Sequence, residues 1–229
     1  MEQPLDTCWT MVRAASLGDR AARSVFSRSY AAVVRRYLEH RWAGSALRQE
    51  VEDALQDVFV ECFKPDGALT KADPAGGDFR GLLYAVVRNV ARRHERAASR
   101  RRAREGAAEL HPDDVPDRAE ALSRMFDRTW AQGVLREAVL RHASRARRGA
   151  ADFRQRYRVL RLRHHRGRSI QQIAADLGEA DVAAVHNAYR RARREFRLVL
   201  REVVARHTGA EGEDNLDAAC RRVTALLGS

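Results

Sequence analysis

The residues best suited to chemistry in this chain lie between Ser169 and Arg193, where helix-capping side chains precede a basic helical face. Ser169 can accept a hydrogen bond at the start of a helix, and Gln172 can complete a capping box. Gly178 can end that short helix because glycine enters the left-handed region without steric cost, and Asp181 can cap the next helix. This pattern predicts a helix-turn-helix, a motif that reads duplex DNA.

The second helix of this pair carries an apolar stripe and, opposite it, a polar and basic face. The stripe comprises Val182, Val185, Tyr189, Ala192, Phe196 and Val199. The candidate duplex contacts are Ser169, Ala183, His186, Asn187, Arg190, Arg191 and Arg194. Asn187 and Arg190 are the predicted base readers, because Asn pairs with adenine and Arg with guanine through two hydrogen bonds. The alternative is a basic helix pair inside an ordinary bundle, with its arginines facing solvent.

Two helical patterns in the N-terminal half carry opposite charge. Residues 50–63 combine a regular apolar stripe with an acidic face that includes Asp53, Gln56 and Asp57. A solvated helix side and a docking face for a basic protein would both account for that face. Residues 79–104 place an aromatic side chain among basic and amide ones: Arg80, Tyr84, Arg88, Asn89, Arg92 and Arg93. This mixture suits an unpaired strand and equally a helix lying over duplex phosphates, so the pattern leaves both open.

Composition restricts the partners and the chemistry. The chain has 229 residues and a formal net charge of +12, which indicates a polyanionic partner, most commonly nucleic acid. Its 3 cysteines lie far apart without zinc-ligand spacing, which fits a reducing cytoplasm. No apolar run is long enough to span a membrane. Without a nucleophile–base pair, paired carboxylates, a phosphate loop or a metal set, we expect no enzyme activity, cofactor or metal.

Helical periodicity runs along the whole chain and predicts an all-α fold of two small domains. A stretch rich in glycine, proline and acidic residues marks an acidic linker at 105–121. The first helical domain then covers 1–104, and the second, with the helix-turn-helix, covers 122–206. Residues 207–229 form a C-terminal extension with one helix, whose apolar stripe we expect to dock on the second domain.

Three motifs in order resemble the extracytoplasmic-function (ECF) sigma factors of bacterial RNA polymerase. EDALQDVFVECF at 52–63 resembles the family's core-binding helix, and FRGLLYAVVRNVARRHER at 79–96 resembles its promoter-melting helix. RAR at 191–193 resembles the end of its second DNA-binding domain, while TCWTMVRAA, ADPAGGDFRGLL and MFDRTWAQGVL are similar to the planctomycete-type group. The sequence departs from the family at Leu82, where an aromatic residue is usual, and in the turn LGEAD, which is one residue longer.

The resemblance implies a sigma factor that binds core RNA polymerase, recognises promoter DNA and helps to melt it. Asp53, Gln56 and Asp57 would contact the clamp helices of the largest polymerase subunit. The loop 71–78 would capture a base flipped out of the minus-ten element. The melted minus-ten strand would run along Arg80, Tyr84, Arg88, Asn89, Arg92 and Arg93, while the helix-turn-helix reads the minus-thirty-five element as duplex. An anti-sigma factor is a candidate further partner, and we expect a monomer when the protein is free.

Two other functions fit the residues. A conventional helix-turn-helix repressor or activator would use the N-terminal half for dimerisation or sensing, and would protect a palindromic operator by itself. An RNA-binding accessory factor would use the arginine-rich helix, and would prefer structured RNA to promoter DNA. The sigma-factor interpretation instead predicts weak DNA binding without polymerase.

Overall fold

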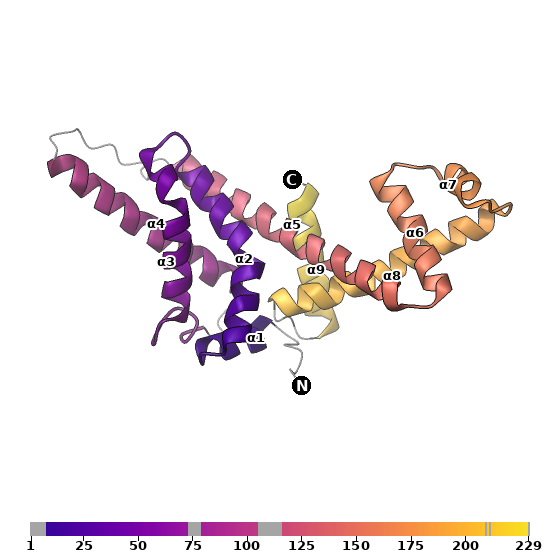
Figure 1. The fold of residues 1–229 in the computed structure, drawn as a ribbon, viewed down its shortest axis with the longest axis horizontal. Coiled ribbons are helices and arrows are strands. Elements are labelled where there is room, and N and C mark those ends of the chain that lie inside the picture. Colours follow the sequence, from indigo (N-terminus) through magenta and orange to yellow (C-terminus); the bar gives the residue numbers. More distant parts are fainter. Residues whose placement is uncertain (1–7, 73–78, 105–115, 209, 211, 229) are drawn as a thin grey trace. The chain divides into compact units, whose positions relative to one another are not determined.

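The computed structural model describes residues 8–72, 79–104, 116–208, 210 and 212–228. Within these residues all regular structure is helical, with α-helices α1 to α9, one 3-10 helix and no strand, so the predicted all-α fold is confirmed. Packing contacts divide the chain into two units (Figure 1). The first unit comprises 1–133 and 205–229, and the second comprises 134–204. No helix within the described ranges is long and apolar enough to cross a membrane.

The first unit is built on three packed helices with a short helix at one end. These elements are α1 (Cys8–Ser16), α2 (Arg20–Arg41), a 3-10 helix (Ala46–Glu50), α3 (Val51–Phe63) and α4 (Phe79–Arg104). Asp19 starts α2, because its side chain accepts a hydrogen bond of 2.7 Å from the Ala22 amide. α2 packs on α3 and α3 packs on α4, so the three helices bury their apolar stripes together (Figure 1).

Aromatic side chains fill the core of the first unit. The ring of Phe26 lies 4.8 Å from that of Tyr30, 5.4 Å from that of Phe63 and 5.7 Å from that of Phe79, measured between centroids. Phe26 and Phe79 are fully buried and join α2 to the first turn of α4. Tilted and edge-to-face pairs of this kind add to the stabilisation that burial alone gives.

A buried ion pair joins the far end of α2 to α4. Arg41 donates to both carboxylate oxygens of Glu95, at 2.7 and 2.8 Å, and both side chains are less than a tenth exposed. The Trp42 indole donates to the same carboxylate at 2.8 Å, and Arg41 also donates to the Tyr37 hydroxyl at 3.3 Å. Because each charge has several partners, this network fixes the position of α4 on α2.

The long helix α5 (Pro116–Arg148) begins in the first unit and ends in the second. Its ring at Phe126 contacts Tyr37 at 6.0 Å and Tyr84 at 5.3 Å, and this packing groups its first part with the first unit. The units therefore differ from the predicted domains 1–104 and 122–206. Residues 116–121, predicted to be linker, belong to α5, and 105–115 lie outside the described residues.

The C-terminal helix α9 (Glu213–Gly228) groups with the first unit, whereas we predicted docking on the second domain. His207 precedes it and contacts residues of the first unit. Its Nδ1 lies 3.2 Å from the Tyr30 hydroxyl, and its ring meets that of Trp130 edge to face. These long-range contacts have no local sequence signal, which explains the different outcome.

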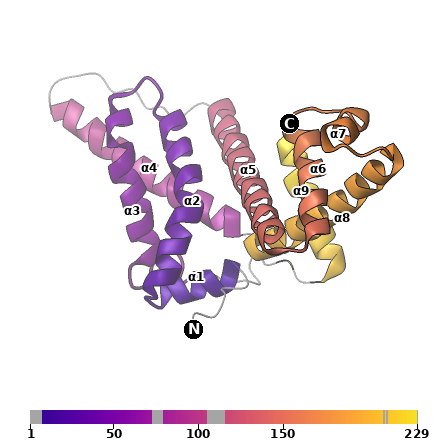
Figure 2. The ribbon, with the colours of Figure 1, turned by 45° about the vertical axis from the view of Figure 1, so that its right-hand side comes forward.

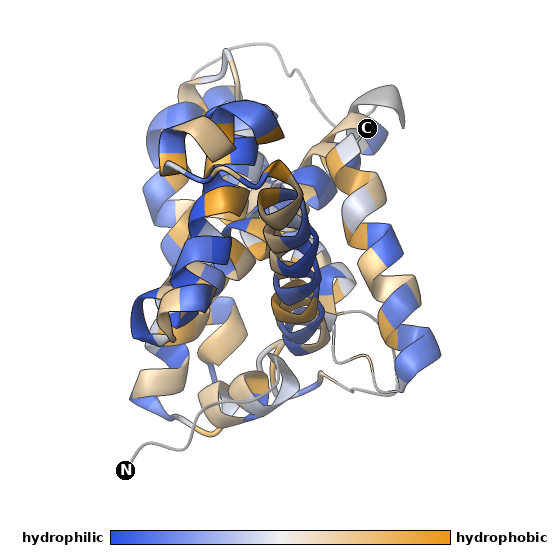
Figure 3. Cartoon of the chain, turned by 90° about the vertical axis from the view of Figure 1, so that its right-hand side faces the viewer, coloured by the Kyte–Doolittle hydropathy of each residue, from blue (hydrophilic) through white to orange (hydrophobic). Residues whose placement is uncertain are grey.

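The second unit consists of the later part of α5, α6 (Ala151–His165), α7 (Ile170–Leu177) and α8 (Val182–Thr208) up to residue 204 (Figure 2). Hydrophobic and hydrophilic bands alternate along these helices, as expected where each buries one face (Figure 3). Its core is smaller than that of the first unit and mostly aliphatic, with Val159, Ile173 and Val185 at its centre.

Candidate nucleic-acid interface

Local hydrogen bonds fix both ends of α7 and the start of α8. The Ser169 hydroxyl accepts from the Gln172 amide at 3.1 Å, and the Gln172 side chain accepts from the Ser169 amide at 2.9 Å. This is the predicted capping box. Gly178 then adopts a left-handed conformation (φ 67°) and ends the helix. The Asp181 carboxylate accepts from the Ala183 amide at 2.8 Å and so helps to start α8.

A small apolar cluster holds α8 against α6 and α7. Its buried members are Val159, Ile173, Ala174 and Val185, with Leu162, Ile170, Leu177, Ala188 and Tyr189 packed around them. The predicted apolar stripe of α8 is buried or half-buried except at its first position, where Val182 is 41 % exposed. Because Val182 is the first residue of α8, it precedes the part of the helix that the cluster covers.

The side chains predicted to contact duplex DNA lie on the exposed side of α8. Ala183, His186, Asn187, Arg190, Arg191 and Arg194 are all exposed. Asn187 and Arg191 also line a hollow of about 390 Å³ between α6 and α8. Among the described residues Arg190, Arg191 and Arg194 form no ion pair, so their charge is available to an external anion. Ser169 is half-buried, and its hydroxyl serves the capping box.

The predicted minus-ten residues divide into two sets on α4. Arg88 and Asn89 are exposed. Arg92 is half-buried and has an interaction partner. Arg93 is more than half exposed, and its guanidinium lies 3.3 Å from the Asp57 carboxylate and 3.6 Å from that of Glu61. The structure therefore does not bring all six residues onto one open face.

Arg80 and Tyr84 are engaged by α5. Arg80 forms an ion pair with Asp127, and both side chains are less than a third exposed. The Tyr84 ring packs against Phe126 and meets Tyr37 edge to face at 5.7 Å. Tyr84, which we predicted to contact the melted strand, therefore packs between α2 and α5. The loop 71–78 is described only at Lys71 and Ala72.

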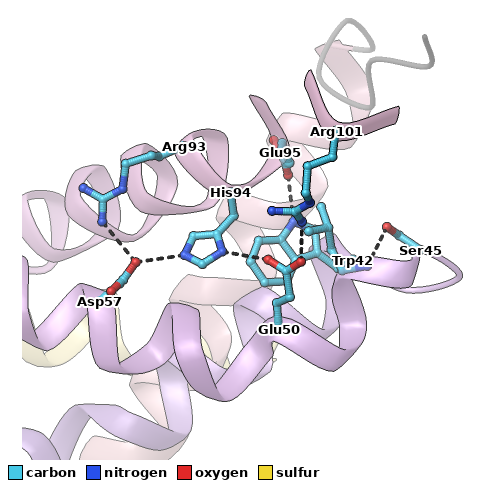
Figure 4. Close-up of polar contacts among 9 residues, drawn as sticks. Trp42, Ser45, Glu50, Asp57, Arg93, His94, Glu95 and Arg101 are labelled. Carbon is cyan, nitrogen blue, oxygen red and sulfur yellow. Dashed lines mark hydrogen bonds and ion pairs between the residues drawn. The ribbon is translucent and has the colours of Figure 1, made fainter. Parts of the chain in front are cut away.

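The predicted polymerase-binding residues occupy the outer side of α3. Asp53 and Gln56 are exposed, and Asp57 is partly exposed. Asp57 accepts from His94 Nε2 at 3.0 Å, while His94 Nδ1 lies 3.0 Å from Glu50 (Figure 4). Sequence reasoning missed His94, since its partners lie 37 and 44 residues away.

Glu50 and Glu61 extend this network along α3. Arg101 of α4 donates to Glu50 at 2.6 Å (Figure 4). A hydrogen bond from Lys64 holds the pKa of the Glu61 carboxyl below its ordinary value, and Arg93 adds to that effect. The acidic side of α3 is thus partly neutralised by α4, whereas Asp53 and Gln56 are exposed and have no partner among the described residues.

No cluster of three or more His, Cys, Asp or Glu side chains that could hold a metal ion occurs within the described residues. Burial raises the pKa of the Cys62 thiol to about 12, so this side chain behaves as a core residue. No family model matches the chain, and no curated protein matches it.

Proposed function

We propose that this protein is a sigma factor that recruits core RNA polymerase to promoter DNA and helps to open it. The observation that supports this most directly is the exposed side of α8, where arginines without an ion pair among the described residues accompany Asn187 on a helix whose start is fixed by a cap. Such a face can enter a major groove and contact base edges and phosphates. The resemblance of the acidic and basic N-terminal helices to sigma-factor motifs extends the proposal from DNA binding to initiation.

In this proposal α3 provides the polymerase contact. Asp53 and Gln56 are exposed on α3, and Asp57 is held by His94 and Arg93 with part of its carboxylate still open. A basic helical surface on the polymerase would form an ion pair with the Asp57 carboxylate and would compete with Arg93 for this carboxylate. His94 then acts as a positioning residue, because it fixes the carboxylate whether or not polymerase is bound.

On α4 the proposal relies on Arg88 and Asn89 as contacts for the melted strand. Both are exposed, and neither has an interaction partner in the part of the chain that the structure describes. Arg80 and Tyr84 receive a different role: they hold α5 against α4, so their loss would weaken DNA opening only through the fold of the first unit. Contacts to the trapped base would offset an unstacking cost of a few kcal/mol per base.

The test is co-purification of the full chain with core RNA polymerase, followed by transcription from a library of genomic fragments. Asp53→Arg is the sharpest variant, because Asp53 is exposed and has no partner to lose among the described residues. We expect it to abolish association, as should Asp57→Arg. The matched control is Asp214→Arg, which reverses the same charge at an exposed position of α9 and should bind as the unchanged protein does.

Other outcomes would point elsewhere. Unchanged association of both α3 variants would remove α3 as the docking surface. Protection of a palindromic duplex by the protein alone, without any association with polymerase, would instead indicate a conventional repressor or activator. Preference for structured RNA over promoter DNA would indicate an RNA-binding accessory factor.

A further inference from the structure

A second hollow in the second unit, away from the duplex-binding residues of α8, is lined mainly by apolar side chains. Its volume is about 390 Å³, and it lies among the later part of α5, α6 and α8. Half-buried side chains form its walls: Leu135, Tyr157, Leu160, Phe196 and Leu200. A hollow of this size and character falls within the range of small-molecule sites.

The most deeply buried side chain that lines it is a histidine. His142 is 1 % exposed and is surrounded by the rings of Tyr157 at 5.3 Å, Phe153 at 5.5 Å and Phe196 at 5.6 Å. Its Nε2 has no hydrogen-bond partner among the described residues. A buried polar atom left unpaired costs about 1–3 kcal/mol, so a ligand that supplies a partner would recover that energy.

The opening of the hollow is positively charged. Arg161, Arg193 and Arg197 line it, are exposed and form no ion pair with the described residues. Arg193 lies 5.8 Å above the ring of Tyr189, which holds its guanidinium on this side of α8. The exposed His164 and His165 lie at the same edge, and none of the lining side chains is a carboxylate. This arrangement attracts an anionic group.

We propose that this hollow binds a small amphipathic anion, with its apolar body on Leu160 and Phe196, a hydrogen-bonding group at His142 Nε2 and its anionic group at Arg161, Arg193 and Arg197. A flat apolar body fits the aromatic and leucine walls. His142 lines the hollow, so a small molecule inside it lies beside this side chain, whereas a helix of a partner protein lying across the opening would leave Nε2 unpaired. The proposal does not depend on the sigma-factor function.

The direct test is a fluorescence titration of the full chain with 6-hydroxy-2-naphthoate, which carries a carboxylate and a hydroxyl at opposite ends of an apolar ring system. We expect saturable binding of one molecule per chain. The analogue 2-naphthoate lacks the hydroxyl and should bind about 3- to 10-fold more weakly, as for the loss of one hydrogen bond in a buried site. The analogue 2-naphthol lacks the carboxylate and should also bind more weakly.

Matched substitutions locate the site. Val139 lines the hollow and is 36 % exposed, so Val139→Trp should fill the hollow and reduce affinity at least about tenfold. The control is Leu140→Trp at the next position of α5, which is 59 % exposed and does not line the hollow. Arg161→Glu should weaken the carboxylate probes, while Arg158→Glu on the same helix should not.

The substitution His142→Phe should remove the preference for 6-hydroxy-2-naphthoate over 2-naphthoate. The absence of saturable binding would overturn the proposal, and so would equal binding by Val139→Trp and Leu140→Trp. Equal affinity for 2-naphthol and 6-hydroxy-2-naphthoate would overturn the anionic class of ligand. Since the titration contains neither polymerase nor DNA, its failure would leave the proposed function untouched.

Discussion

The two units differ in how their charged side chains are paired and buried. In the first unit Arg93 and Arg101 of α4 meet acids of neighbouring elements, in the pairs Arg93–Asp57 and Arg101–Glu50, and the pair Arg41–Glu95 is buried. In the second unit, ion pairs such as Arg156–Glu195 hold helices together, while the arginines of the exposed side of α8 remain unpaired within the described residues. The first unit therefore joins two of its helices through a buried ion pair, whereas the pairs Arg156–Glu195 and Arg145–Glu202 of the second unit are more exposed.

The largest expected effect lies at the buried pair of the first unit. Glu95→Ala should destabilise the protein by about 3–5 kcal/mol, because it leaves Arg41 buried without its counter-ion. Urea unfolding would measure this. Glu202→Ala, which removes the exposed pair with Arg145 in the second unit, is the control and should cost no more than about 1 kcal/mol. Equal losses in the two variants would break the contrast between the units.

A smaller effect is expected on promoter binding. Arg190→Ala should cost about 1–3 kcal/mol of binding by the polymerase complex and relax specificity at one upstream base pair. Competition binding with substituted promoter fragments would measure both. The control Arg158→Ala removes the same charge from an exposed position of α6. An equal loss on every promoter sequence would make Arg190 a phosphate contact.

Loss of the capping box is expected to change the free energy of unfolding by about 1 kcal/mol. Ser169→Ala removes the hydrogen bond from the Gln172 amide and should lower the free energy of unfolding by about that amount. Ser169→Thr keeps a hydroxyl at the cap and is the control. Thermal unfolding would measure both, and a large loss of DNA affinity with unchanged stability would restore Ser169 as a direct DNA contact.

The smallest expected effect is the pH dependence that His142 contributes. Burial first, and Arg145 second, lower its pKa below the ordinary 6.5. The unfolded chain therefore takes up a proton at this histidine more readily than the folded chain does. The contribution of neutral His142 to the free energy of unfolding is fully present above about pH 6.5 and is lost as the pH falls. His142→Phe should reduce the drop in urea midpoint between about pH 7.5 and about pH 5.5. His165→Phe, at an exposed position, is the control and should leave the drop unchanged.

Sequence reasoning succeeded where the determining interactions are local. Ser169, Gly178 and Asp181 act on atoms within a few residues, and the structure has the predicted helix ends there. The exposed side of α8 also followed from periodicity alone, because the apolar stripe is buried by neighbouring helices.

Local patterns did not reveal interactions between distant segments. The pattern around Tyr84 predicts contact with nucleic acid, but its ring packs on Phe126, which lies beyond the predicted first domain. Arg80 pairs with Asp127 for the same reason. The pairing of Arg41 with Glu95 across 54 residues was equally hidden, since neither helix alone indicates which of its charges is buried.

The indole of Trp42 that donates to Glu95 has a practical consequence for spectroscopy. The chain has 3 tryptophans, Trp9, Trp42 and Trp130, and all belong to the first unit, while residues 134–204 contain none. Intrinsic tryptophan emission therefore reports on the first unit, whereas far-ultraviolet circular dichroism reports on the helices of both. Recording the two signals during one denaturation separates the melting of the second unit from that of the first without any introduced label.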